Sequence, residues 1–551
     1  MPVLPRRLPD EPVPVSREAA SERCFRPARQ PGGDPASLAT ARTSPFGWRL
    51  AGYTLCLGGG VLGLPGPFGH LPGAALLLPL GTMTLILRAG SLRAACLDSF
   101  LAAAAAWVVP VFWVRMPALI QGGSTAQIAW LWPVVIAVGK GMYLAIFAFL
   151  IRLAAPRAGP GLLGLYAGLG WFAMEMAKSG WCKCPLLQFV TGLSPWPWMI
   201  QACSLAGAYG LAALLTACAA WAVVPAGSPR PRILCAVALL ALGAHSLTAV
   251  SDLPDASGTL RVAVIQGNSP VIFKWDPTVT HALLNRYVAL SEQAVAQASR
   301  PDVVIWPETA LPTYYLPGLP STARIRDLAR ALKTHLILGV LHPEPENGEA
   351  VVYNRAVLLG PDGPGAPELA YTEKTRLVPF GEYVPRFFTF IPRMVTNVGQ
   401  VRPGRRSAPL EFGQASAGVL ICFESMYPGV AQGLAAQGAN ILVNLSNDAW
   451  FKGSPEPDAH LNHAVLRAVE QGLTMVRATN TGITSVIDAR GRMVLRAPQD
   501  EALWVDTGPL DLNRERTFYH LYGDTERTVL LGAFFALTLF FAVARIFRPK
   551  A

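Results

Sequence analysis

The sequence predicts a two-part fold, in which a bundle of membrane-spanning helices carries an α/β domain. Apolar residues make up 52% of the 551 residues and charged residues only 15%, which is too apolar for a soluble enzyme of this length. The apolar residues crowd into 48–250 and 528–547, whereas 258–515 has the composition of an ordinary globular domain. That middle segment alternates strand-like and helix-like patterns, which is typical of a layered α/β domain.

The remaining parts of the chain divide as follows. Residues 1–45 are rich in Pro, Arg and Ser without an apolar period, so we expect a disordered tail there. Seven apolar runs follow within 46–252 and an eighth lies within 526–547, each close to the ~20 residues that cross a bilayer. The predicted spans are about 47–65, 70–88, 94–114, 129–152, 159–178, 198–224, 232–250 and 528–544.

Basic residues predict the orientation of these spans. Seven arginines precede the first span and Arg49 lies at its start, three basic residues follow the last, and arginine pairs separate spans two and three, four and five, and six and seven. With eight spans all of these fall on one side, which the positive-inside rule makes cytoplasmic, against Arg115, Lys178 and Lys183 on the other. Both termini are then cytoplasmic and 258–515 lies on the outer face. The net charge of +11 has the same origin, so we do not expect nucleic-acid binding.

Periodicity predicts the elements of the α/β domain. Strands are expected at 261–266, 303–306, 335–341, 351–359, 418–422 and 440–444, and helices at 278–299, 321–332 and 459–472. A hairpin is expected over 483–494, turning at Arg490-Gly491. In such domains the functional site lies at the strand ends.

Cys422 is the residue around which this domain is organised. Eight of the nine cysteines lie before residue 236, so Cys422 is alone in the domain. An apolar strand delivers it into a polar turn that contains Glu424. This setting fits a nucleophile better than a disulfide partner or a metal ligand. A small buried hydrophobe is the alternative interpretation.

Two other polar residues at or beside strand ends can supply what a thiol nucleophile needs. A thiol is mostly protonated near neutral pH, and Glu308 could take its proton. Lys374 could stabilise the thiolate and then the oxyanion of a tetrahedral intermediate, with the backbone N–H of Phe423 as a second donor. Glutamate and lysine are usually solvated surface charges, so spacing alone is weak support for this triad.

The motifs around these residues resemble the nitrilase-type carbon–nitrogen hydrolase superfamily, and more closely the apolipoprotein N-acyltransferases, its integral membrane branch. The resemblance runs from about residue 47 to the C-terminus. The segments that carry it are Val264–Asn268 with Lys274-Trp275, Ile305–Ala310, Glu373-Lys374 with Leu377–Glu382, Ile421–Glu424, Leu445–Phe451 and Arg477–Thr484. It implies a nitrilase-like αββα sandwich, a catalytic triad of Glu308, Lys374 and Cys422, and neither cofactor nor metal.

The resemblance also implies roles for neighbouring residues. Glu382 would pair with Lys374, Glu424 would be essential, and Trp275 would pack over the pocket, although a core tryptophan is an equal interpretation. Two positions depart from the family pattern. Phe423 stands where Tyr is common, which keeps the ring and the backbone donor, and Leu186 lies where Pro-Trp-Leu is common, which leaves lipid contact there open.

Two further groups have a plain and a functional interpretation. Phe387, Phe388, Phe390, Ile391 and Met394 could be core, but the intervening arginines and flanking prolines favour an arm that dips into the membrane surface. His460 and His463 have i, i+3 spacing without an obvious Glu or Cys partner, so a helix face is favoured over a metal site.

The function implied is transfer of an acyl chain from a phospholipid to the N-terminal amine of a diacylglyceryl-cysteine apolipoprotein, through a thioester on Cys422, in a bacterial inner membrane with the catalytic domain in the periplasm. A membrane-tethered amidase that hydrolyses its acyl-enzyme with water is the first alternative, because the triad serves both. A paralogue that binds lipoproteins without acylating them is the second, and the intact triad argues against it.

Overall fold

The computed structural model describes residues 45–120, 126–186, 188–225, 229–253, 255–269, 277–346, 348–361, 368–384, 401–499, 501–514 and 516–546. The predicted tail, apart from Pro45, lies outside these residues, as do Trp275 and the apolar arm around 387–394.

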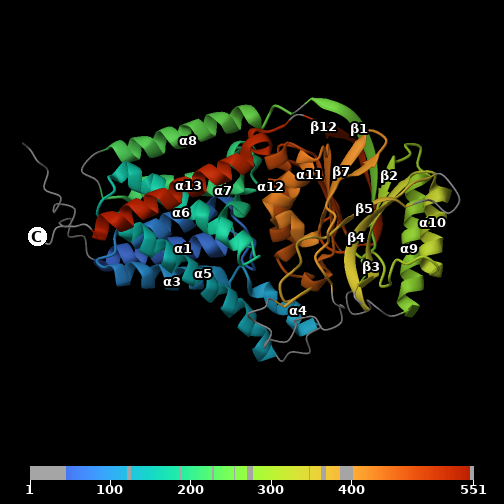
Figure 1. Cartoon of the computed structure of the whole chain (residues 1–551), viewed down its shortest axis with the longest axis horizontal. Coiled ribbons are helices and arrows are strands. Elements are labelled where there is room, and N and C mark those ends of the chain that lie inside the picture. The colour runs from blue at the N-terminus through green and yellow to red at the C-terminus, as the bar shows by residue number, and fades with distance from the viewer. Residues whose placement is uncertain are drawn as a thin grey trace, which may run out of the picture. The chain divides into compact units, whose positions relative to one another are not determined.

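A helix coincides with each predicted span (Figure 1). The helices are α1 (Pro45–Leu62), η2–α2 (Pro72–Leu76 and Leu77–Leu87), α3 (Leu92–Val108), α5 (Ala126–Ala154), α6 (Pro160–Gly180), α7 (Cys203–Val223), α8 (Arg230–Ala249) and α13 (Phe518–Ile546). The short helices η3 (Phe112–Val114), α4 (Arg115–Ile120), η4 (Phe189–Leu193) and η5 (Pro197–Met199) connect them.

Not every one of these helices meets the length and hydropathy expected of a span. Among the described residues, four do so alone: Ala129–Ala154, Cys203–Val223, Arg230–Ala249 and Phe518–Arg545. A fifth candidate is the pair Leu92–Val108 and Phe112–Ile120, which bends by 63°. The structure therefore supports a membrane region of several helices, while the count of eight stays a prediction.

The α/β domain consists of two six-stranded sheets packed face to face. The first has the order β12-β1-β2-β3-β4-β5 and the second β11-β10-β9-β8-β7-β6. The strands of the first are β12 (Leu503–Asn513), β1 (Ala256–Gln266), β2 (Val303–Ile305), β3 (His335–Glu346), β4 (Glu349–Leu359) and β5 (Glu368–Glu373). Those of the second are β11 (Met493–Arg496), β10 (Ser485–Ile487), β9 (Met475–Thr479), β8 (Ile441–Ser446), β7 (Ala415–Ile421) and β6 (Leu410–Phe412).

Helices cover the outer face of each sheet, so the domain has the expected αββα layers. A core between the sheets joins residues such as Val264 and Ile305 to Val419 and Val443. The helices α9 (Pro277–Val295) and α10 (Pro320–Leu332) pack on the first sheet, and α11 (Pro428–Ala436) and α12 (Glu456–Gln471) lie beside the second (Figure 1). Parallel pairing of β1, β2 and β3, and of β7, β8 and β9, brings their carboxyl ends together within each sheet.

Helix α12 of the α/β domain also packs against the membrane helices. One continuous apolar core includes Leu461 and Val465 of α12 together with Ile200 and Leu211. At Gly207 the backbone of α7 leaves helical geometry, with φ 63° and ψ 177°. The N–H of Ala208, freed by this bend, donates to Glu470 Oε1 of α12 at 2.8 Å. Glu470 is held in turn by Arg467, and both side chains are fully buried.

The predicted strands and helices of the domain are confirmed, with ends that differ by a few residues. The hairpin is also confirmed, since β10 and β11 pair around Gly491, whose φ of 82° requires the left-handed region that glycine tolerates. Sequence periodicity missed β5, β6, β9, β12 and α11. Most of these elements are short or have mixed polarity. In β12, buried and exposed residues alternate irregularly around a bulge.

Candidate active site

The structure brings the buried side chains of Glu308 and Lys374 into direct contact. Lys374 Nζ lies 3.0 Å from Glu308 Oε1 and 2.9 Å from Glu382 Oε1, and the lysine side chain is only 1% exposed. Burial disfavours the ammonium charge, but the carboxylates of Glu308 and Glu382 more than offset this and hold the pKa of Lys374 well above its ordinary value. Asn354 Nδ2 also donates to Glu308 Oε1 at 2.9 Å, so at least two donors face this oxygen.

Cys422 begins the turn η8 (Cys422–Met426) directly after β7, as predicted. Its φ of 54° lies in the left-handed region, which costs about 1–3 kcal/mol for a residue with a side chain. Burial and then the Glu308 carboxylate raise the pKa of the thiol well above its ordinary value, whereas Lys374 lowers it. The thiol is therefore protonated at rest, and it can react only if a neighbouring base removes its proton.

Glu424 joins the segment that carries Lys374 to the turn that carries Cys422. Its Oε1 accepts from Thr375 N at 2.7 Å, Thr375 Oγ1 at 2.8 Å and Arg376 N at 3.2 Å. Its Oε2 accepts from Ile421 N at 2.9 Å. Since Thr375 follows the lysine and Ile421 precedes the cysteine, this one carboxylate fixes the two residues relative to each other.

Comparisons with known proteins place the chain and its α/β domain in known families. The carbon-nitrogen hydrolase family model matches residues 261–517. An apolipoprotein N-acyltransferase from Geobacter metallireducens is 34% identical over 404 residues, covering 70% of this chain and 74% of that protein. Proteins of the same name from Azotobacter vinelandii and Caulobacter vibrioides are 33% and 32% identical and cover 82% and 78% of this chain, and 88% and 82% of their own lengths.

The chain belongs to the apolipoprotein N-acyltransferase family. The resemblance predicted from the motifs is thus confirmed, and with it an acyltransferase that carries a carbon–nitrogen hydrolase domain.

The two departures from the N-acyltransferase pattern meet in one apolar cluster. Phe423, Met426 and Tyr427 form its buried part, and Leu186 packs against them. The rings of Phe423 and Tyr427 lie 5.5 Å apart, edge to face. Tyr427 also donates its hydroxyl to Lys183 O at 2.6 Å. The turn after Cys422 is therefore bound to the loop that follows α6, and the Phe423 ring is buried within this apolar cluster.

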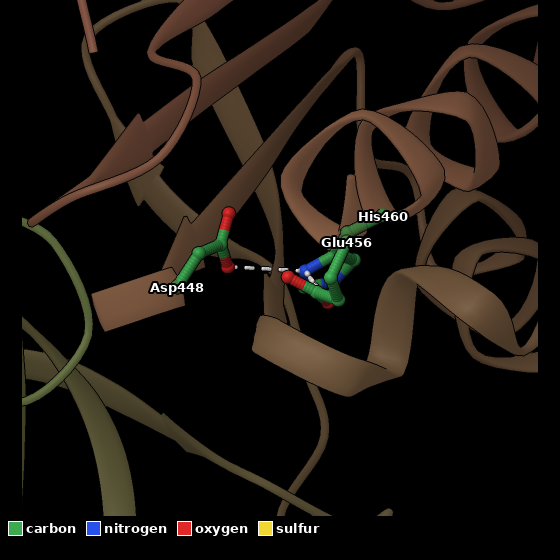
Figure 2. Close-up of side chains that lie close together, drawn as sticks. All are labelled: Asp448, Glu456 and His460. Carbon is green, nitrogen blue, oxygen red and sulfur yellow. Dashed lines mark hydrogen bonds and ion pairs between the residues drawn. The ribbon is translucent and has the colours of Figure 1, made fainter. Parts of the chain in front are cut away.

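The prediction for His460 was incomplete, because Glu456 and Asp448 both approach it. Figure 2 shows the three side chains together, with Asp448 coming from the short helix η9 (Asp448–Phe451) and Glu456 and His460 from α12. Their ligand atoms lie within 4.8 Å of one another and all three side chains are buried, which is spacing that could hold a metal ion. His460 Nδ1 lies 3.2 Å from Asp448 Oδ1 and 3.7 Å from Glu456 Oε1.

A guanidinium already supplies the positive charge at this cluster. Arg477 Nη2 lies 2.7 Å from Asp448 Oδ2 and 3.1 Å from His460 Nδ1. Despite burial, Arg477 and His460 lower the pKa of Asp448, so Asp448 is ionised beside the guanidinium. Burial and the charge of Asp448 instead raise the pKa of Glu456 well above its ordinary value, so Glu456 is protonated and neutral. Since the arginine satisfies the charge of Asp448, the set does not fit a resident metal ion.

Several residues of the site gave no signal in the sequence. Asn354 lies mid-strand in β4, and Thr375 differs in no way from a loop threonine until Glu424 is placed beside it. Arg477 stands inside a segment noted for its resemblance and Asn444 ends a predicted strand, but the burial of Arg477 could not be foreseen, because an arginine in an apolar strand usually points to solvent. A polar residue within an otherwise apolar strand was the only available hint.

Proposed function

We propose that this chain transfers an acyl chain from a membrane phospholipid to the N-terminal amine of diacylglyceryl-cysteine apolipoproteins, through a thioester on Cys422. The observation that carries the proposal is the buried ammonium of Lys374, held between Glu308 and Glu382. Membership of the N-acyltransferase family and the several apolar helices support the lipid substrates. Both substrates are anchored in lipid, so a membrane-embedded enzyme meets them without either leaving the bilayer.

In the first half-reaction, Glu308 takes the thiol proton of Cys422 as the sulfur attacks the ester carbonyl of the phospholipid. The new S–C bond gives a tetrahedral oxyanion, which Lys374 and the Phe423 N–H stabilise. The ester C–O bond then breaks, and protonated Glu308 returns its proton to the departing alcohol of the lysophospholipid. Because the thiol is neutral at rest, its charge develops only when the carbonyl is in place.

In the second half-reaction, the α-amine of the acceptor attacks the thioester. Glu308 removes a proton from the attacking nitrogen, the C–S bond breaks, and Cys422 recovers its thiol proton from Glu308. The product is an amide, and the overall scheme is ping-pong. Glu382 holds Lys374 in place through both halves and accepts from Val378 N at 2.8 Å.

The placement in the membrane is part of the proposal. We propose eight spans, formed by 46–252 and 526–547, with both termini in the cytoplasm and the catalytic domain, 258–515, on the periplasmic face of the inner membrane. Trp275 is proposed to pack over the substrate site, and the arm around 387–394 is proposed to dip into the membrane surface. Cysteine substitutions at Lys333 and Asp524 test the orientation, because an impermeant maleimide added to intact spheroplasts reaches only the periplasmic face. Both sites should be labelled, and the absence of labelling would contradict the proposed orientation.

The intact mass of the detergent-purified full chain tests the chemistry. After exposure to phosphatidylethanolamine we expect one acyl-sized adduct, which moves to the amine of an added diacylglyceryl-cysteine peptide. Cys422→Ser should lose the adduct, and Cys182→Ser, which alters an exposed cysteine, should keep it. An adduct that disappears at the same rate without peptide would identify water as the acceptor and make the chain a hydrolase. A folded protein that never acquires an adduct would refute the triad.

A further inference from the structure

The backbone carbonyl of Cys422 receives hydrogen bonds from three side chains. His460 Nε2 lies 3.1 Å from Cys422 O, Ser425 Oγ donates at 3.2 Å, and Asn444 Nδ2 donates at 3.4 Å. Most backbone carbonyls in a turn have one partner or water. Three donors from a turn, a strand and a helix hold this one oxygen in a single orientation.

Arg477 determines which atoms His460 and Asn444 present to that carbonyl. A guanidinium has only N–H donors, so every atom that faces it must accept. It faces Asn444 Oδ1, which leaves Asn444 Nδ2 to donate to Cys422 O. His460 Nδ1 faces both Arg477 and Asp448 Oδ1, while its Nε2 faces Cys422 O, which can only accept, so Nε2 carries a proton. Burial and then the charge of Arg477 lower the pKa of His460, against the opposing effect of Asp448, and this favours the neutral ring. Arg477 is fully buried on β9.

The orientation of this carbonyl also sets that of the next N–H. The Cys422 C=O and the Phe423 N–H belong to one planar trans peptide unit and point in opposite directions. Fixing the carbonyl therefore fixes the direction of the Phe423 N–H. The hydrogen bonds on the oxygen also polarise the amide and strengthen its N–H as a donor. They oppose relaxation of the strained Cys422 backbone, whose φ is 54°.

We propose that His460 is a positioning residue, which acts with Asn444 and Arg477 to aim the Phe423 N–H at the oxyanion. The inference rests on the proposed function of Cys422 as the acylated nucleophile. It gives the buried cluster of Figure 2 a role in catalysis without a metal ion. His460 does not touch the reacting atoms. Its removal should therefore lower the rate of a reaction that forms an oxyanion and leave unchanged the rate of a reaction that forms none.

Two reactions of the same thiol separate this role from a structural one. Alkylation of Cys422 by iodoacetamide displaces iodide at a saturated carbon and forms no oxyanion, whereas acylation by phosphatidylethanolamine forms one. For His460→Leu in the full chain we expect the ratio of acylation rate to alkylation rate to fall roughly tenfold to a hundredfold. His460→Gln, which can return an N–H donor, should recover a good part of that ratio, and a KM for phospholipid close to wild type is expected in both.

Controls make the outcome decisive. His463→Leu removes a histidine from the same helix with the same burial, and it should leave the ratio unchanged. If His460→Leu does not fold, Ser425→Ala removes another donor without leaving a large cavity and should lower the ratio severalfold. An unchanged ratio in the folded variants, or an equal fall in both rates, would overturn the proposal. Alkylation without acylation in the wild type would refute the proposed function instead.

Discussion

The hydrogen bonds of Glu424 lead to a prediction about two substitutions at one position. The amide oxygen of Glu424→Gln can still accept from Thr375 and Arg376, but its NH₂ group then faces the N–H of Ile421. Loss of this one charge-assisted hydrogen bond should lower the free energy of unfolding by about 2–3 kcal/mol. Glu424 is only 2% exposed, so Glu424→Ala leaves three backbone N–H groups without an acceptor. We expect this to lower the free energy of unfolding by about 4–6 kcal/mol.

The same substitutions should affect acylation in the same order. Glu424 sets the distance between Lys374 and Cys422, and a displacement of about 1 Å in an active site costs on the order of a hundredfold in rate. We expect single-turnover acylation to fall about tenfold in Glu424→Gln and about a hundredfold in Glu424→Ala. The assay combines unfolding in detergent with the rate of adduct formation at a temperature where every variant is folded.

Glu411→Gln is the matched control for this experiment. Glu411 is an exposed carboxylate of the same sheet that accepts one hydrogen bond, from Ser416 Oγ at 2.6 Å, and its loss should cost less than about 1 kcal/mol. If Glu424→Gln and Glu424→Ala were equally slow but as stable as wild type, the carboxylate would act through its charge on the thiol. The bridging argument would then be wrong.

Three further predictions concern the surroundings of the nucleophile. Glu308→Gln should slow acylation by about a hundredfold to ten-thousandfold, because it removes the base for a neutral thiol, and the intact-mass assay would contradict this by showing the adduct at the normal rate. Gly339→Ala should also slow acylation, since its Cβ would lie 2.6 Å from Glu308 Cα, whereas Gly433→Ala meets nothing within 4 Å and serves as its control. Because the pKa of His460 is lowered in the folded state, the unfolded chain binds a proton that the folded chain does not as pH falls below about 6.5, so acid destabilises the protein. His460→Gln should therefore lose less of its melting temperature than wild type between about pH 7.5 and 5.5, and equal losses would contradict the assignment.

The sequence predicted the layered α/β domain and the positions of Glu308 and Cys422 after apolar strands, because both depend on local patterns, whereas Lys374 follows β5, which periodicity missed. Glu308 follows β2 of the first sheet and Cys422 follows the apolar strand β7 of the second, so parallel pairing gathers strand ends within each sheet but does not by itself bring these residues together. Glu382 was expected to pair with Lys374, and the contact is present. The positions of Glu308 and Cys422 after apolar strands are visible in the sequence, whereas the pairing of Glu382 with Lys374 was expected from the family resemblance.

The parts that could not be predicted depend on contacts between distant segments. Glu424 was expected to matter, but only the folded chain shows it accepting from Thr375, 49 residues earlier. His460 was interpreted as a helix-face residue, because no nearby motif pointed to Asp448 or Arg477, which lie on other elements. A buried polar network of this kind is built by tertiary packing, which periodicity does not record.

The bend of α7 at Gly207 has a consequence for how the molecule is assembled during synthesis. Glu470 of α12 caps Ala208, which is made long before it, while its own carbonyl accepts from Thr517, immediately before α13. The contact between the membrane helices and the α/β domain is thus formed by α7, by α12 and by the residue before α13. It can form only after all three have been synthesised. Translation must therefore be almost complete before Arg467 and Glu470 are enclosed. A catalytic domain cut free of its helices would expose this charged pair and the apolar face of α12, so we expect it to aggregate rather than work as a soluble enzyme.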